Sequence, residues 1–278
     1  IPILDFKKLD LDKINHYTSS RGLEKLRNKI SEYYHKEYGA YFNYKKEIII
    51  STGSKPLIFM ALKAILNRKD EVIILEPAWL SYKEQIKLCG GETKFIKFTD
   101  GINKIKKSIS KKTKMIILNN PNNPSGKIYT KKEIQEIYNL CLKKKIWLLV
   151  DEAYSDFIES NFFSAIKCDK KKRNLIVVNS LSKNMGISGW RIGYIISNED
   201  LIEQILKLNQ HIITCAPSIL MYYLSEYFDE IIKITKPQIN FLLKKRQEIS
   251  KILDENKIKY LKGKTTFYFF IDLRDYKI

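Results

Sequence analysis

Short apolar runs alternate with amphipathic segments through the central part of the chain. Seven runs rich in Ile, Leu and Val have the length of buried strands, and the segments between them repeat apolar residues at helical spacing. This alternation is typical of βαβ units whose parallel sheet is buried on both faces. It predicts an α/β fold with a mostly parallel sheet. The strands are expected at residues 47–51, 71–75, 94–98, 114–119, 146–150, 175–179 and 191–197.

The pattern changes after residue 200. Long helical stretches follow one another there, and a strand pattern returns only at residues 266–273. This change predicts a large domain at residues 25–212 and a smaller α+β domain formed by residues 1–24 and 213–278. Helices are expected at residues 56–67, 131–144, 201–210, 219–227 and 238–255.

The charge is strongly positive, with 50 Lys and Arg against 31 Asp and Glu and a formal net charge of +19. Such a balance is found in proteins that bind nucleic acid or anionic membranes. However, 43 of the basic residues are Lys and seven are Arg, whereas specific recognition of phosphates and bases usually uses Arg. We therefore expect no nucleic-acid partner and interpret the charge as a solvated basic surface. A field that attracts anionic substrates is the alternative.

The sequence gives no sign of a metal site, a disulfide framework or a membrane segment. The four cysteines stand far apart without a CxxC pair, and the three histidines do not cluster, so neither a metal site nor a disulfide framework is predicted. No apolar run has the length of a membrane span, and the first residues do not form a signal peptide. The chain is therefore predicted to be cytoplasmic, with no membrane partner.

Four predicted strands end in polar segments, at the edge where open parallel sheets bind their ligands. These segments are residues 51–56 (STGSKP), 119–126 (NNPNNPSG), 151–154 (DEAY) and 180–183 (SLSK). The first is a glycine turn into a helix, which offers backbone N–H groups to an anion but is also common as a plain connection. Taken alone, Asp151 would be a helix-capping residue and Lys183 a surface lysine.

Taken together, the segments resemble the signature segments of class I/II aminotransferases, which are pyridoxal-phosphate enzymes of fold type I. The resemblance lies in residues 120–126, 151–154 and 180–194, which occur in the order and near the spacing of the family. It extends to residues 17–26, 53–55 and 77–79, and so covers nearly the whole chain. It implies a three-layer α-β-α large domain and pyridoxal 5'-phosphate as the cofactor.

The resemblance assigns catalytic roles to three residues. Lys183 would hold the cofactor as a Schiff base, the internal aldimine, and would then act as the general base that moves the substrate proton. Asp151 would pair with the pyridine nitrogen and keep it protonated. Tyr154, together with Asn123, would hydrogen-bond the ring oxygen of the cofactor.

The resemblance also implies the remaining cofactor contacts. Trp79 would stack on the cofactor ring, although a lone Trp after a strand is more often part of the core. Tyr17 would reach the phosphate of a neighbouring subunit, which implies a homodimer. The phosphate would otherwise be held by backbone groups, hydroxyls and one guanidinium, those of Gly53, Ser54, Lys55, Ser180, Ser182 and Arg191.

The chain departs from the family pattern at both ends. In the family, the arginine that binds the substrate carboxylate lies farther along the chain than the 95 residues that follow Lys183, and Arg274 comes too early to be that arginine. The glycine-bearing N-terminal segment of the family is not seen either. We therefore expect a fragment of a longer protein, with the C-terminal part of the small domain missing, rather than a degenerate relative.

The predicted activity is transfer of an amino group from an amino acid to a 2-oxo acid. A C–S lyase, a decarboxylase or a synthase of the same fold type would use the same cofactor residues, and a non-catalytic cofactor-binding relative is a further alternative. The GWRIGY form of residues 189–194 favours the aspartate, alanine and aromatic aminotransferase subgroup. The motifs do not determine the amino donor or the acceptor.

Overall fold

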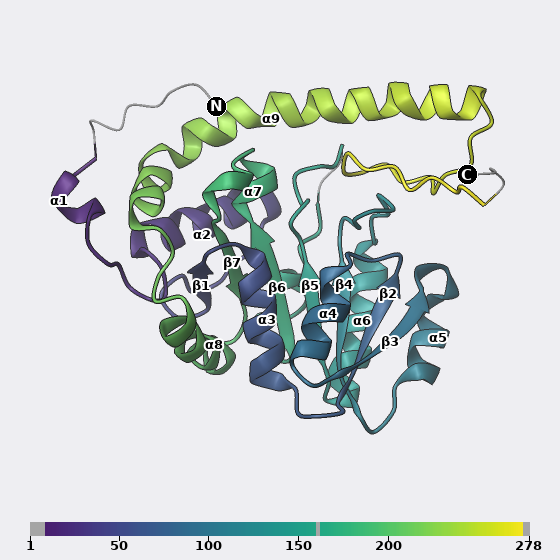
Figure 1. Ribbon diagram of the computed structural model, residues 1–278, viewed down its shortest axis with the longest axis horizontal. Helices are drawn as coiled ribbons and strands as arrows, with labels where there is room; N and C mark the ends of the chain where they lie inside the picture. The colour runs from purple at the N-terminus through teal and green to yellow at the C-terminus, as the bar shows by residue number, and fades with distance from the viewer. Residues whose placement is uncertain (1–8, 160–161, 275–278) are drawn as a thin grey trace.

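The protein, analysed as a computed structural model in which residues 9–159 and 162–274 are described, is built around one seven-stranded sheet (Figure 1). The strand order is β1-β7-β6-β5-β4-β2-β3. Neighbours from β6 to β3 are parallel, whereas β7 runs antiparallel to both β1 and β6. The predicted mostly parallel sheet is confirmed. Its strands are β1 (Ile48–Ser51), β2 (Glu71–Glu76), β3 (Glu92–Lys97), β4 (Thr113–Asn119), β5 (Trp147–Asp151), β6 (Leu175–Ser180) and β7 (Gly193–Ile196).

Alternate residues of the strands supply two separate cores, because successive side chains of a strand point to opposite faces. Helices α3, α4 and α8 pack on one face with residues such as Ile117 and Val178. Helices α2, α5 and α6 and the first part of α9 pack on the other face with residues such as Ile116 and Val177. The result is the three-layer α-β-α arrangement that the family resemblance implied. The covering helices are α2 (Glu24–Tyr38), α3 (Ser54–Ile65), α4 (Ser81–Leu88), α5 (Gly101–Ser108), α6 (Lys131–Lys144), α8 (Glu199–Ile212) and α9 (Ser218–Glu255).

Helix α6 has the bounds that its sequence predicts, because both ends carry capping signals. The Thr130 side chain accepts the N–H of Glu133 at 3.2 Å, and the Glu133 carboxylate accepts the N–H of Thr130 at 2.7 Å. This is a capping box, which satisfies two N–H groups at the helix start. Lys145 ends the helix in the left-handed conformation. The shorter helical elements of the described chain are α1 (Leu11–Ile14), α7 (Leu181–Asn184), η2 (Phe98–Asp100), η3 (Ala165–Cys168) and η4 (Ser188–Trp190).

Helix α9 replaces the two separate helices expected at residues 219–227 and 238–255. It is one element of 38 residues, with a kink where Tyr227 has non-helical backbone angles and with Pro237 inside it. Pro237 stands directly before the second expected helix, and proline normally interrupts a helix. The buried Phe228, Ile231 and Thr235 continue the inward stripe through this region and keep it helical.

Two expected strands differ from the observed structure. Residues 266–273 form no strand, and a single bridge joins Tyr260 to Ile271. The last strand of the sheet starts at Gly193 rather than at residue 191, because Arg191 has a positive φ of 56° and lies after the 3₁₀ helix η4. Arg191 is thereby freed from the sheet and can point towards the strand ends.

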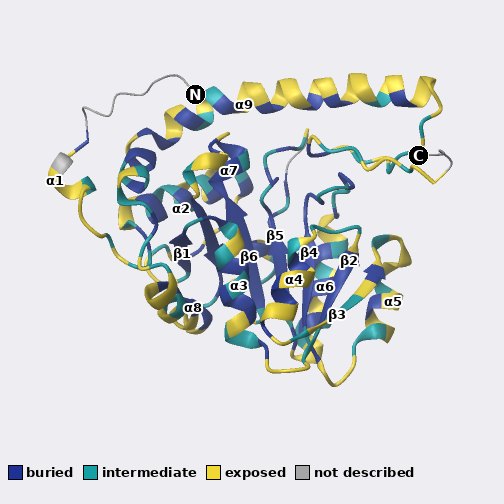
Figure 2. Cartoon of the chain, in the orientation of Figure 1, coloured by how far each residue is buried: buried dark blue, intermediate teal, exposed yellow. Residues whose placement is uncertain are grey.

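Burial follows the layers, as Figure 2 shows, with the central strands of the sheet buried, the edge strand β3 partly exposed and the second half of α9 largely exposed. Phe241, Leu242, Ile249 and Ile252 on that half are between 42% and 57% exposed. Among the helices in the described part of the chain, none combines the length and the apolar character that a membrane crossing needs. The predicted domain division, with the large domain at residues 25–212, stays a prediction.

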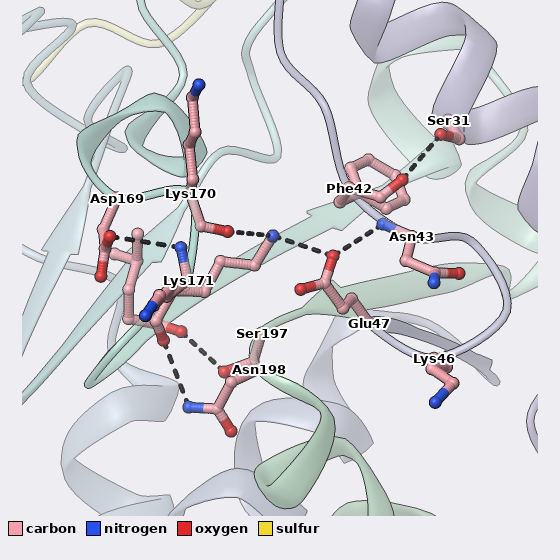
Figure 3. A network of polar contacts seen from close by, with 12 residues as sticks. Ser31, Phe42, Asn43, Lys46, Glu47, Asp169, Lys170, Lys171, Ser197 and Asn198 are labelled. Atoms are coloured by element: carbon pink, nitrogen blue, oxygen red, sulfur yellow. Dashed lines mark hydrogen bonds and ion pairs between the residues drawn. The ribbon is translucent and has the colours of Figure 1, made fainter.

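A buried ion pair ties together the edge of the sheet opposite the carboxyl strand ends. Lys172 is 2% exposed, and its ammonium group lies 2.9 Å from the Glu47 carboxylate. The same carboxylate accepts the N–H of Asn43 at 2.6 Å, and the Asn198 amide donates to the Lys172 carbonyl oxygen at 3.2 Å (Figure 3). These contacts join the loop before β6 to the start of β1 and to the end of β7.

Candidate active site

A cavity of about 210 Å³ lies at the carboxyl edge of the sheet, next to the ends of β4, β5 and β6 and the turn that follows β1. The parallel topology brings these segments together, although they are separated by up to 130 residues in sequence. Ten of the predicted site residues line it: Ser54, Lys55, Trp79, Asn123, Asp151, Tyr154, Ser180, Ser182, Lys183 and Arg191.

Two predicted site residues do not line the cavity. Gly53 is not among the lining residues, and a Cβ atom there would come within 2.6 Å of Nη2 of Arg191, which does line the cavity. Tyr17 is 86% exposed on the surface of the chain. A contact from Tyr17 to the phosphate of a neighbouring subunit stays a prediction.

Asp151 is the buried acid of the cavity. It ends β5, and its carboxylate accepts hydrogen bonds from the Tyr82 hydroxyl at 2.6 Å and from the Ala153 N–H at 3.1 Å. Burial raises the pKa of Asp151, while the two hydrogen bonds oppose that change. A cationic group beside the carboxylate would add to the effect of these hydrogen bonds and keep the carboxyl group ionised.

The loop after β4 is fixed by its own side chains. The Asn119 amide donates to the Asp151 carbonyl oxygen at 2.9 Å, and its side-chain oxygen accepts the Asn123 N–H at 2.6 Å. Asn122 accepts both the N–H and the hydroxyl of Ser125, at 3.1 and 2.6 Å. The Asn/Pro-rich segment is therefore a rigid wall that holds Asn123 at the cavity.

Lys183 is held in the short helix α7 directly after β6. The Ser180 hydroxyl accepts the Ser182 N–H at 3.2 Å and so caps this helix. The amine of Lys183 lies 5.8 Å from the centre of the Phe267 ring. The only primary amines among the described cavity residues are those of Lys183 and Lys55, and Lys55 lies over the Trp79 ring at 5.0 Å.

One corner of the cavity is built for an anion. Helix α3 starts there without a side-chain cap at Gly53, so the first N–H groups of the helix remain available. Glycine at position 193 allows close approach, because a Cβ atom there would collide with the backbone N of Ser54. Arg191 donates to the Ser188 carbonyl oxygen at 2.7 Å and contacts the Ser182 hydroxyl at 3.5 Å, which keeps its guanidinium at this corner.

Sequence reasoning missed five residues that line the cavity. Tyr82 comes one helical turn after Trp79, and Asn119 is the last residue of β4, so both positions could have been inferred from the neighbouring motifs. Tyr268 carries no such signal, because it belongs to a segment for which a strand was predicted. The five residues are Tyr82, Asn119, Ala153, Ser188 and Tyr268.

A mostly parallel α/β sheet with a lysine, a buried carboxyl group and an anion corner in one cavity at its carboxyl edge is the architecture of fold type I pyridoxal-phosphate enzymes. The sequence model described as Aminotransferase class I and II matches residues 4–277. The chain belongs to this family. The family resemblance, the fold class and the membership of an enzyme family are thereby confirmed.

Individual relatives agree with this placement. The chain is 38% identical over 246 residues to the (5-formylfuran-3-yl)methyl phosphate transaminase of Methanocaldococcus jannaschii, covering 87% of this chain and 64% of that protein. It is 33% identical to an aspartate aminotransferase of Sulfurisphaera tokodaii, with 96% and 69% covered. The crystal structure of an aromatic aminotransferase from Pyrococcus horikoshii superposes with a TM-score of 0.90 at 29% identity, over 95% of this chain and 74% of that one. The chain thus spans about two thirds of the length of its relatives.

Members of this family use pyridoxal phosphate, and the cavity fits that group. The anion corner suits its phosphate, the Asp151 carboxylate suits a protonated ring nitrogen, and the Lys183 amine suits its aldehyde. Close contacts at Gly53 and Gly193 would not tolerate a Cβ atom, as a cradle for a phosphate requires. Within the described residues, no group of three or more His, Cys, Asp or Glu side chains could hold a metal ion.

Proposed function

We propose that the protein is an amino-acid aminotransferase, which takes the amino group of a donor amino acid and passes it to a 2-oxo acid. The observation that carries the proposal is that Lys183 shares one cavity with Asp151, Asn123, Tyr154 and Arg191. The similarity to a transaminase and to an aspartate aminotransferase supports it. A homodimer and a cytoplasmic location are part of the proposal.

The chain's own residues divide the work. When bound, pyridoxal phosphate supplies an electron sink for the charge that develops at the substrate Cα. Lys183 would hold the cofactor covalently and, once displaced by the substrate amine, would remove the proton from Cα as a general base. Asp151 would keep a proton on the pyridine nitrogen, since an ionised carboxylate in a buried site strongly favours a cation beside it.

Binding and orientation fall to the remaining residues. The N–H groups of Ser54 and Lys55, the hydroxyls of Ser180 and Ser182 and the guanidinium of Arg191 would bind the phosphate. Trp79 would cover one face of the ring and exclude water from it. Asn123 and Tyr154 would donate hydrogen bonds to the ring oxygen. Tyr17 of a second copy would complete the phosphate site.

The test is an absorbance spectrum of the protein with added pyridoxal phosphate, before and after borohydride, followed by peptide mapping of the reduced lysine. We expect a visible band and a modified Lys183. The variant Lys183→Ala should lose the reducible adduct, whereas Lys63→Ala, which removes an exposed lysine of α3, should keep it. An adduct that survives in Lys183→Ala would disprove the assignment.

The type of reaction is tested by half-transamination. Amino acids are added singly to the loaded protein, and the loss of the visible band is compared with the appearance of the 2-oxo acid. Asp151→Ala should slow this step far more than it weakens cofactor retention. Release of carbon dioxide or sulfide instead of a 2-oxo acid would favour a decarboxylase or a lyase.

A further inference from the structure

The segment of residues 263–268 packs on the loop of residues 122–126, which forms one wall of the cavity. The Lys264 N–H and the Thr265 hydroxyl both donate to the Gly126 carbonyl oxygen, at 3.1 and 2.9 Å. The contact is close, because a Cβ atom at Gly263 would collide with the Ser125 carbonyl oxygen. Figure 1 shows this C-terminal segment beneath α9, above the carboxyl edge of the sheet.

Arg246 of α9 holds the same segment from the other side. Its guanidinium donates to the Tyr268 carbonyl oxygen and, at 3.0 Å, to the Gly263 carbonyl oxygen. It also lies 4.1 Å from the centre of the Phe269 ring, and the residue is 4% exposed. One buried side chain therefore fixes both ends of the segment, and the position of Tyr268 with them.

This arrangement brings Tyr268 into the candidate active site. Its hydroxyl accepts a hydrogen bond from the Tyr154 hydroxyl at 3.1 Å, and both residues line the cavity. Their rings meet edge to face with centres 5.9 Å apart, next to the apolar cluster of Phe157, Ile239 and Leu243. The two hydroxyls thus form a pair whose geometry is set by packing on all sides.

We propose that Tyr268 is a positioning residue that acts through Tyr154: it donates a hydrogen bond to the Tyr154 hydroxyl while Tyr154 donates its own proton to the cofactor ring oxygen. The inference rests on the proposed function. Tyr154 has a single hydroxyl proton, and a negatively charged oxygen is a stronger acceptor than a neutral phenol. When the ring oxygen is present, the Tyr154 proton turns towards it, and Tyr268 reverses from acceptor to donor.

Donation from Tyr268 to Tyr154 would strengthen the bond from Tyr154 to the ring oxygen, because hydrogen bonds in series strengthen each other by about 10–30% per bond. In the loaded protein, the ring oxygen would carry its full negative charge only when the nitrogen that joins Lys183 to the cofactor has no proton. Donation to that oxygen therefore lowers the pKa of the nitrogen. Losing the Tyr154 hydroxyl should raise this pKa by about one unit, and losing the Tyr268 hydroxyl by about 0.3 units.

The experiment is a pH titration of the visible absorbance of the loaded protein for four proteins: wild type, Tyr268→Phe, Tyr154→Phe and the double variant. We expect Tyr268→Phe to raise the pKa by about 0.3 units alone and to add nothing in the Tyr154→Phe background. Arg246→Lys should shift the pKa in the same direction, because the segment is held less firmly. Tyr260→Phe is the matched control, since this hydroxyl contacts Ser250 away from the cavity.

Each outcome separates the two proposals. A wild-type protein that forms no visible band on Lys183 would overturn the proposed function. A normal band with an unchanged or lowered pKa in Tyr268→Phe would overturn the role of Tyr268 alone, because Tyr268 would then be idle or would compete for the Tyr154 proton. A shift that persists in full in the Tyr154→Phe background would show that Tyr268 does not act through Tyr154.

Discussion

Glu152 is a buried carboxyl group beside the candidate active site, and its titration should make stability depend on pH. Its oxygens accept hydrogen bonds from the Ser164 hydroxyl at 2.8 Å and the Ala165 N–H at 2.7 Å. Burial outweighs these bonds and raises the pKa of Glu152 from 4.5 to about 8. The folded protein therefore keeps a proton at neutral pH that the unfolded chain has released.

The sign follows from the raised pKa. The stabilisation by this proton is complete below pH 4.5 and is lost as the pH rises towards 8. The loss is at most about 1.36 kcal/mol per pH unit. Between pH 5.5 and pH 7.5, Glu152 should therefore reduce the free energy of unfolding by about 2–3 kcal/mol.

The variant Glu152→Gln isolates this effect, because its amide keeps the shape of the neutral acid and does not titrate. We expect the stability of the wild type relative to Glu152→Gln to fall by about 2–3 kcal/mol over that interval, measured by urea unfolding with tryptophan fluorescence. Glu133→Gln is the control. Despite partial burial, hydrogen bonds with Thr130 and Lys127 hold the pKa of Glu133 below its usual value. The difference in unfolding free energy between the wild type and Glu133→Gln should therefore not change above about pH 5.5. If the unfolding free energies of the wild type and Glu152→Gln differ by the same amount at pH 5.5 and pH 7.5, this result refutes the reasoning.

Three further substitutions test the anion corner, the ion pair at the opposite edge and the α6 cap. Gly53→Ala should cost about 1–3 kcal/mol and weaken phosphate binding, because φ is +95° and the new Cβ would meet Arg191; urea unfolding and phosphate titration at wild-type values would contradict this. Lys172→Met should lower the free energy of urea unfolding by about 2–3 kcal/mol, because it leaves Glu47 without its cation. Adding Glu47→Gln should recover part of this loss, and an equal loss in the single and the double variant would argue against the ion pair. Thr130→Ala should lower the unfolding free energy by about 1 kcal/mol, and an unchanged value would show that the cap does not stabilise the protein.

The sheet could be predicted from the sequence because its strands, apart from the edge strand β3, are short apolar runs between polar segments. The observed bounds differ from the predicted ones by one or two residues, as for β3 at Glu92–Lys97 against residues 94–98. The C-terminal third of the chain was harder to predict, because local sequence preferences and tertiary packing favour different structures there. Pro237 predicts a helix boundary, whereas the buried stripe of α9 carries the helix through it.

The candidate site could be predicted where chemistry and topology coincide. Asp151 ends one buried strand and Lys183 follows another, so the parallel sheet alone brings them to one edge. Tyr268 could not be found in this way, because its contact with Tyr154 spans 114 residues and depends on where Arg246 holds a segment without regular structure. Such a position is set by tertiary packing and leaves no periodic pattern in the sequence.

Tyrosine hydroxyls from distant segments contact two of the side chains that we propose to bind the cofactor ring. Tyr82 donates to the Asp151 carboxylate, and Tyr268 pairs with the Tyr154 hydroxyl. A phenol hydroxyl donates or accepts by rotating one bond, so it can follow a change of charge on its partner without movement of the backbone. The proposed transamination would move a proton at the Lys183 nitrogen while Asp151 keeps the ring nitrogen protonated, so the charge that faces Tyr154 would change during the reaction. The Tyr268 hydroxyl would follow this change by rotation, while the Tyr82 hydroxyl keeps its bond to Asp151 and the cavity walls stay rigid.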